Sequence, residues 1–143
     1  MAKLPIVRDQ MDKHVATLFP ETDILDAVAF LVEKRVTGAP VVDRSGKLIG
    51  ILTEKDCLRL VAKGVEGKLP RGTVATYMTS EPQTVSPTMD IYYAAGLFID
   101  RDFRRFLVVE DGKLVGAITR FDILRAVSAN LALLGGRAPA DAK

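Results

Sequence analysis

Two stretches of the chain carry a threonine followed three residues later by an aspartate. The pairs are Thr53 with Asp56 and Thr119 with Asp122. This spacing is typical of a capping box, in which both side chains bond free N–H groups at the start of a helix. A helix N-terminus also suits a phosphate, and a carboxylate beside it can accept both hydroxyls of a ribose. The spacing alone is compatible with either role, or with both.

Each pair belongs to a longer repeated phrase, "GILTEKDCLRLV" at 50–61 and "GAITRFDILRAV" at 116–127. The repeat extends to nearly the whole chain at an offset of 67 residues, which becomes 66 where "DRSGK" meets "EDGK". We therefore divide the chain into a first repeat (7–63), a linker (64–73), a second repeat (74–129) and a flexible C-terminal tail (130–143). Two copies are too few for a solenoid, so we expect them to pack about a pseudo-twofold axis.

The first half of each repeat reads as a short strand followed by a helix. The strands are predicted at 15–19 and 83–86, and Thr22 and Thr88 are the predicted N-caps of the helices. Apolar residues then recur at helical spacing, and this pattern predicts one core-facing side on each helix. The residues assigned to these core faces are Ile24, Ala27, Val28, Leu31 and Val32, and Ile91, Ala94, Ala95, Phe98 and Ile99.

The second half of each repeat reads as two strands joined by a tight turn, followed by a helix. The paired strands are predicted within 39–53 and 106–119, and Asp111-Gly112 is a strong two-residue hairpin signal. The last helices are expected to begin near Thr53 and Thr119. The order β-α-β-β-α, present twice, predicts an α+β fold.

Composition excludes several classes of function. The chain has 143 residues, 48% of them hydrophobic, with a net charge of +2 that does not indicate nucleic acid or a membrane surface as a partner. No apolar run is long enough to span a bilayer, and "MAKLPIVRDQMDKH" lacks a signal-peptide core. With Cys57 the single cysteine, no intrachain disulfide is possible, so we expect a reducing, cytoplasmic location. Cys57 matches Ile123 and is expected to be a small buried residue. With His14 the single histidine, we expect no metal site and no catalytic triad.

The element order, the stretches "MTSEPQTVSP" and "APVVD", and the Thr–x–x–Asp helix starts closely resemble the cystathionine β-synthase domain, or CBS domain. Two such domains in tandem resemble a Bateman module, and the resemblance covers about residues 7–129. It implies two clefts that bind adenosine-containing ligands: AMP, ADP, ATP or S-adenosylmethionine. It also implies a homodimer.

The resemblance implies a ligand role for matched residues in both repeats, with Asp56 and Asp122 on the ribose. The implied ligand-binding residues are Thr17, Val36, Thr37, Gly38, Ala39, Pro40, Thr53 and Asp56 in the first repeat, and Thr84, Phe103, Arg104, Arg105, Phe106, Thr119, Arg120 and Asp122 in the second. The second repeat departs from the family pattern at Leu107, where proline is common, and at the bulky Phe106. The first repeat departs from it at Met11-Asp12.

The arginines of the second repeat make the two clefts unequal. Arg104, Arg105 and Arg120 favour phosphate, so we expect the cleft of Asp122 to prefer the more phosphorylated ligand. The most consistent interpretation is a regulatory ligand sensor without catalysis and without a catalytic cofactor, which signals to an unidentified partner protein. The alternative is a ligand-free dimerising scaffold whose Thr–x–x–Asp motifs only cap helices.

Overall fold

The structure is a computed structural model that describes residues 4–135. The described chain forms two compact units, and each is named here by its capping-box aspartate. The Asp56 unit contains residues 16–82 and 111–114. The Asp122 unit contains residues 4–15, 83–110 and 115–135.

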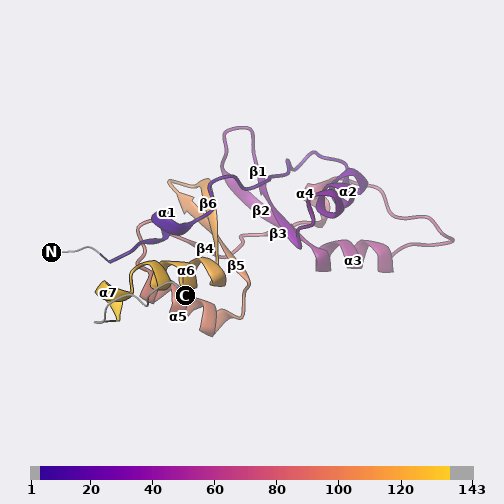
Figure 1. Cartoon of the computed structure of the whole chain (residues 1–143). Helices are drawn as coiled ribbons and strands as arrows, with labels where there is room; N and C mark the ends of the chain where they lie inside the picture. Colours follow the sequence, from indigo (N-terminus) through magenta and orange to yellow (C-terminus); the bar gives the residue numbers. More distant parts are fainter. Residues whose placement is uncertain (1–3, 136–143) are drawn as a thin grey trace. The chain divides into compact units, whose positions relative to one another are not determined.

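The Asp56 unit is an antiparallel three-stranded sheet with helices. Its strands follow the order β1-β2-β3, and α2 and α3 each contact the short α4. Figure 1 shows the long connection from α3 to α4 extending away from both helices. The elements are α2 Ile24–Lys34, β1 Gly38–Val42, β2 Leu48–Thr53, α3 Glu54–Ala62, α4 Val74–Tyr77 and β3 Thr79–Ser80.

The Asp122 unit has the second three-stranded sheet, in the order β4-β5-β6, with β4 parallel to β5. Helices α5 and α6 lie side by side, and α1 contacts α6 (Figure 1). The elements are α1 Val7–Gln10, β4 Thr84–Val85, α5 Ile91–Arg101, β5 Arg105–Glu110, β6 Lys113–Thr119, α6 Arg120–Ala129 and α7 Leu131–Leu134, with the first residues of β6 in the Asp56 unit.

The segment that opens each repeat folds into the unit that holds the other repeat's capping box. Val7 of α1 is fully buried in the Asp122 core, and Val74 of α4 is fully buried in the Asp56 core. Burying one such valine side chain contributes about 1.5–3 kcal/mol. The Asp12 and Ala117 backbones exchange two hydrogen bonds of 2.8 and 3.0 Å. The sequence repeat did not reveal this exchange. The pattern of apolar residues shows that the opening segment of a repeat is buried, but not in which of the two units.

The exchange explains the glycine that opens each repeated phrase. A Cβ on Gly50 would lie 2.6 Å from Met78 Sδ and 2.9 Å from the Thr79 carbonyl oxygen. At the matched Gly116, a Cβ would lie 2.7 Å from both the Asp12 carbonyl oxygen and Met11 Sδ. Glycine at both positions therefore lets the exchanged segment approach the backbone of β2 or β6.

The predicted helix starts need one correction. Thr22 and Thr88 are not the N-caps of α2 and α5; Asp23 and Asp90 cap these helices instead. The Asp23 carboxylate accepts from the Leu25 and Asp26 amides, and Asp90 accepts from the Tyr93 amide. Aspartate is at least as good an N-cap as threonine, so the prediction missed the cap by one residue in α2 and by two residues in α5.

Other predicted elements are present with shifted bounds. The strand predicted at 15–19 is reduced to one parallel bridge, Leu18 to Val41, and the matched strand is β4. Asp111 and Gly112 both have positive φ, at 53° and 79°, as the predicted hairpin turn requires. Of the tail predicted as flexible, 131–134 form α7 and 136–143 lie outside the described residues.

Candidate functional site

Both Thr–x–x–Asp stretches form complete capping boxes. In the Asp56 unit, the Thr53 amide donates to Asp56 Oδ2 at 2.9 Å, and the Asp56 amide donates back to Thr53 Oγ1 at 3.2 Å. In the Asp122 unit, the Thr119 amide donates to Asp122 Oδ2 at 2.8 Å, and the Asp122 amide donates to Thr119 Oγ1 at 3.2 Å. The capping role is therefore confirmed at both sites.

The Asp56 carboxylate has further partners that occupy both of its oxygens. The Thr53 hydroxyl lies 3.0 Å from Oδ2, and Arg59 Nη1 donates to Oδ1 at 3.0 Å. The Thr79 hydroxyl, which the exchanged β3 brings in, lies 3.2 Å from Oδ1 and 3.4 Å from Oδ2. The Asp56 side chain is 3% exposed. Its carboxylate is thus buried and well supplied with donors.

The Asp122 carboxylate has fewer donors. Besides the Thr119 amide on Oδ2, Arg125 Nη2 donates to Oδ1. The Asp122 side chain is 12% exposed. An ionised carboxylate offers about four lone-pair positions, so one position on each oxygen is unfilled among the described residues.

In the Asp56 unit, the predicted ligand-binding residues converge on the end of the sheet where α3 begins. The Leu18 amide donates to the Pro40 carbonyl oxygen at 2.9 Å, so Thr17 lies beside β1. Gly38 is the register partner of Thr53 across β1 and β2. The first amide of α3, that of Glu54, donates to the Thr37 carbonyl oxygen at 2.9 Å.

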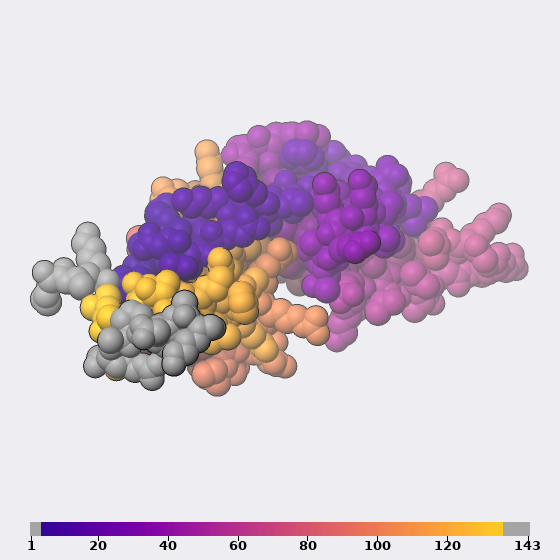
Figure 2. Space-filling model, viewed as in Figure 1, coloured from indigo at the N-terminus to yellow at the C-terminus, as the bar shows by residue number. Residues whose placement is uncertain are grey.

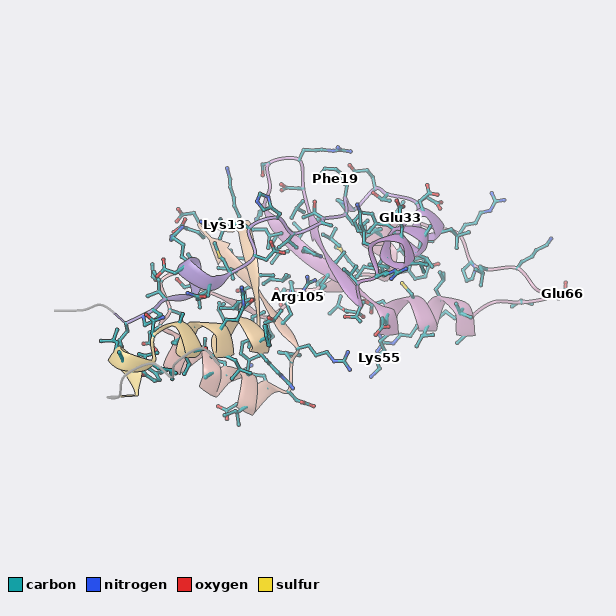
Figure 3. All side chains as sticks on the ribbon, viewed as in Figure 1. Lys13, Phe19, Glu33, Lys55, Glu66 and Arg105 are labelled. Atoms are coloured by element: carbon teal, nitrogen blue, oxygen red, sulfur yellow. The ribbon has the colours of Figure 1, made fainter. Side chains whose placement is uncertain are left out.

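In the Asp122 unit, the matched residues take corresponding places. Thr84 of β4 is paired with Leu107 of β5, and it is exposed. Arg105, which Figure 3 labels, opens β5. Thr119 closes the neighbouring β6. Burial lowers the pKa of the Arg105 guanidinium, and the Asp12 carboxylate acts in the opposite direction.

Several predicted residues differ in what they can offer to a ligand. Val36 is half-buried against the Asp56 core, and Ala39 and Pro40 are buried, so they can offer mainly backbone groups. Phe106 is 2% exposed and packs against Phe98 and Phe103, with ring centroids 4.7 and 5.5 Å away.

The two arginines that flank this region are both exposed. Arg104 lies in the approach to β5, whereas Arg120 points back to the end of α5. Arg120 Nε donates to the Phe103 carbonyl oxygen at 2.9 Å, and its Nη2 donates to Asp102 Oδ1 at 3.2 Å. Arg120 of α6 is thus held by the connection between α5 and β5.

A second feature is an apolar groove between the two long helices of each unit. Val32 and Ile99, which the periodicity assigned to the core, are 73% and 82% exposed. Val32 and Ile99 line the grooves because the apolar face of each helix is wider than the part of it that packs against the core. The groove residues are Val28, Leu31, Val32, Glu54, Cys57, Leu58 and Val61 in the Asp56 unit, and Ala95, Phe98, Ile99, Asp102, Arg120, Ile123 and Leu124 in the Asp122 unit.

Cys57 and His14 supply no evident chemistry. Cys57 is half-buried in its groove, where burial and then Asp56 raise the pKa of the thiol. His14 is exposed, and its backbone amide bonds Asp12 Oδ1 at 2.9 Å. Across residues 4–135, no three His, Cys, Asp or Glu side chains gather to hold a metal. No helix in that range is long and apolar enough to cross a membrane.

Three partners of the two carboxylates were not predicted from the sequence: Thr79, Arg59 and Arg125. The arginines sit three residues after each aspartate in both repeats, so the helical spacing could have revealed them. Thr79 could not be found this way, because it comes from the exchanged segment. The residue matched to it in the other repeat is Asp12.

The profile of the CBS domain matches residues 5–63 and 74–129, so the chain belongs to the CBS domain family and carries two repeats. One relative is the A-adding tRNA nucleotidyltransferase of Aquifex aeolicus, 35% identical over 87% of this chain. Another is the chloroplastic CBS domain-containing protein CBSX2 of Arabidopsis thaliana, 32% identical over 75% of this chain. The chain spans only 15% and 56% of these proteins.

Two solved structures are similar in both fold and sequence. CBSX2 in complex with AMP has a TM-score of 0.72 and 34% identity, covering 92% of this chain and 98% of that chain. The CBS domain pair of protein MJ0100, in complex with 5′-methylthioadenosine and S-adenosyl-L-methionine, has a TM-score of 0.69 and 26% identity. It covers 95% of this chain and all of its own. These likenesses confirm the predicted α+β fold.

Proposed function

We propose that this protein is a regulatory module that binds an adenosine-containing ligand and catalyses no reaction. The ligand is AMP, ADP, ATP or S-adenosylmethionine. The observation that carries the proposal is the Asp122 carboxylate, which is held by a capping box at the start of α6. On each of its oxygens, one acceptor position is left unfilled by residues 4–135. A ribose diol has two hydroxyl donors that match these positions. The AMP complex of the related CBSX2 supports the choice of ligand.

The proposed binding residues divide into those that act through side chains and those that act through backbone. Thr84, Thr119 and Asp122 offer oxygen atoms to the ribose or phosphate in one unit. Thr17, Thr53 and Asp56 stand at the matched positions of the other unit, where a ligand would meet the same residue types. Backbone groups of Val36, Thr37, Gly38, Ala39 and Pro40, and of Phe103, Arg104, Arg105 and Phe106, border the base. Arg104, Arg105 and Arg120 supply the positive charge around the Asp122 site.

Regulation requires that ligand binding change something a partner can detect. A ligand shifts a conformational equilibrium only by its differential affinity for the two states. We propose that the readout passes to another protein, and that the module works as a homodimer in the cytoplasm. The two exposed apolar grooves support assembly, because each would otherwise leave large apolar side chains in water.

The second candidate function is a dimerising scaffold without a ligand. The scaffold function is favoured by the Asp56 capping box, in which both reciprocal hydrogen bonds are formed. Helix capping alone therefore accounts for the Thr–x–x–Asp motif of that unit. The two functions differ in one property: a sensor is stabilised by its ligand, and a scaffold is not. Ligand at 100 times its Kd adds about 2.7 kcal/mol to the free energy of unfolding.

The test is native mass spectrometry of the purified protein, followed by thermal unfolding with AMP, ADP, ATP and S-adenosylmethionine. We expect a co-purified adenosine compound, or a raised Tm with at least one of the four ligands. Incubation of the bound nucleotide should leave it unchanged, because no catalysis is proposed. No adduct and no shift in Tm with any of the four would favour the scaffold.

A further inference from the structure

The two capping-box carboxylates differ in the number of protein donor groups that are hydrogen-bonded to them. Four donor groups reach Asp56, from Thr53 (amide and hydroxyl), Arg59 and Thr79. They match the roughly four lone-pair positions of an ionised carboxylate. Within residues 4–135, two donor groups reach Asp122, from Thr119 and Arg125. The two sites are therefore unequal before any ligand arrives.

One of the two additional donors on Asp56 is the Thr53 hydroxyl, and the other comes from a matched position in the exchanged segments. Thr79 pairs with Ile51 of β2, and Asp12 pairs with Ala117 of β6, the counterpart of Ile51. The hydroxyl of Thr79 can donate to the neighbouring carboxylate. An ionised Asp12 has no hydrogen to donate, and its Oδ1 instead accepts from the His14 amide at 2.9 Å.

A ribose diol that approaches Asp56 with both hydroxyls would have to replace two donors, the Thr79 hydroxyl on Oδ1 and the Thr53 hydroxyl on Oδ2. Exchange of one hydrogen bond for another brings little net gain, because the first is lost. A diol that approaches Asp122 adds two hydrogen bonds to a charged acceptor and replaces no donor that residues 4–135 supply. Hydrogen bonds to charged groups are about twice as strong as neutral ones.

We infer that Thr79 closes the Asp56 site to a ribose, that Asp12 leaves the Asp122 site open, and that the chain binds one adenosine-containing ligand. Thr79 is a specificity-determining residue that acts through Asp56 and does not itself touch the ligand. The inference rests on the proposed ligand-binding function and adds to it the number and place of the sites.

The experiment is calorimetric titration of the full chain with AMP. We expect one site in the wild type, lost in Asp122→Asn and kept in Asp56→Asn. Thr79→Val removes the hydroxyl at nearly constant shape, frees one acceptor position on Asp56 and should open a second site that is weaker than the first. Thr79→Ser restores the hydroxyl and should return the count to one, which a merely structural role for the threonine methyl group would not do.

A matched pair at Asp12 tests the donor argument in the other unit. Asp12→Thr supplies Asp122 with a hydroxyl donor and should weaken AMP binding at least tenfold. Asp12→Val removes the same negative charge without supplying a donor, and it should bind AMP more tightly than Asp12→Thr does. Far-ultraviolet circular dichroism of each variant checks that it is folded.

Two equal sites in the wild type would overturn the inference, as would a Thr79→Val variant that binds AMP like the wild type. Loss of binding in Asp56→Asn but not in Asp122→Asn would also overturn it. Absence of AMP, ADP, ATP and S-adenosylmethionine binding in every variant is a different outcome, because it refutes the proposed function itself.

Discussion

The hydroxyl of Thr79 lies 3.2 Å from Oδ1 of Asp56, although the two residues are 23 positions apart in the chain. The bond joins the segment that opens the second repeat to the capping box of the first. It is possible because the opening segments are exchanged and because Gly50 leaves room for Met78 and Thr79 beside β2. The repeated phrase thus serves two purposes. Its glycine leaves room for the segment that opens the other repeat, and its Thr–x–x–Asp stretch starts a helix and places a carboxylate within reach of hydrogen-bond donors.

The glycine positions give a prediction about stability. Gly50→Ala and Gly116→Ala should each lower the free energy of unfolding by about 1–3 kcal/mol, because the added Cβ overlaps a backbone oxygen of the exchanged segment. Gly96→Ala in α5 is the control, since a Cβ there has no neighbour within 4 Å and alanine favours a helix. Urea unfolding measures all three. Equal effects at Gly50, Gly116 and Gly96 would contradict the role assigned to the exchange.

The grooves give a prediction about assembly. Leu58 and Leu124 are 65% and 63% exposed at matched places on α3 and α6. Replacing either with aspartate should leave the fold intact and shift the protein from dimer to monomer, because a charge would be buried at the interface. Val65→Asp is the control, since Val65 is 69% exposed and lies outside both grooves.

Figure 2 shows the linker that contains Val65 projecting from the surface of its unit, and Figure 3 labels Glu66 near its tip. A charge placed there should not disturb a contact made by α3 or α6. Light scattering at micromolar concentration gives the mass of each variant. A dimeric Leu58→Asp/Leu124→Asp double variant, or a monomeric wild type, would argue against assembly through the grooves.

The arginines give a prediction about ligand choice. Arg104 is exposed at the approach to β5, so Arg104→Ala should weaken ATP binding more than AMP binding, by several-fold. Arg120→Ala should change the ratio less, because Arg120 is already bonded to Asp102 and the Phe103 carbonyl oxygen. Titrations with both nucleotides measure the ratio. An unchanged ratio in Arg104→Ala would contradict the preference for a more phosphorylated ligand.

Much of the fold could be predicted because it depends on local pattern. The Asp111-Gly112 turn, the strands beside it and both capping boxes follow from residue types at short range. The predicted caps lie one residue before Asp23 and two residues before Asp90, since nearby threonines are acceptable caps too. Val32 and Ile99 were wrongly assigned to the core, because helical periodicity defines a face but not how much of it a partner covers.

The two aspartates of the candidate site could be predicted from the sequence, but the side chains that surround them could not. Asp56 and Asp122 stand out because both repeats place an acid three residues after a threonine. Their difference depends on Thr79 and Asp12, which reach the boxes only through the exchanged segments. A contact between residues far apart in sequence leaves no periodic signal, so only the folded chain reveals it.

The most direct test of the central claim is the affinity of AMP for the wild type and for Asp122→Asn, measured by calorimetry on the same preparation. The loss of a charged acceptor for a ribose diol should weaken binding by about 1.5–3 kcal/mol, a factor of ten or more. The loss of one capping carboxylate should lower stability by only about 1 kcal/mol. We therefore predict that Asp122→Asn stays folded and loses AMP. Equal AMP affinity in the wild type and in Asp122→Asn would contradict the account and leave Asp122 with a capping role alone.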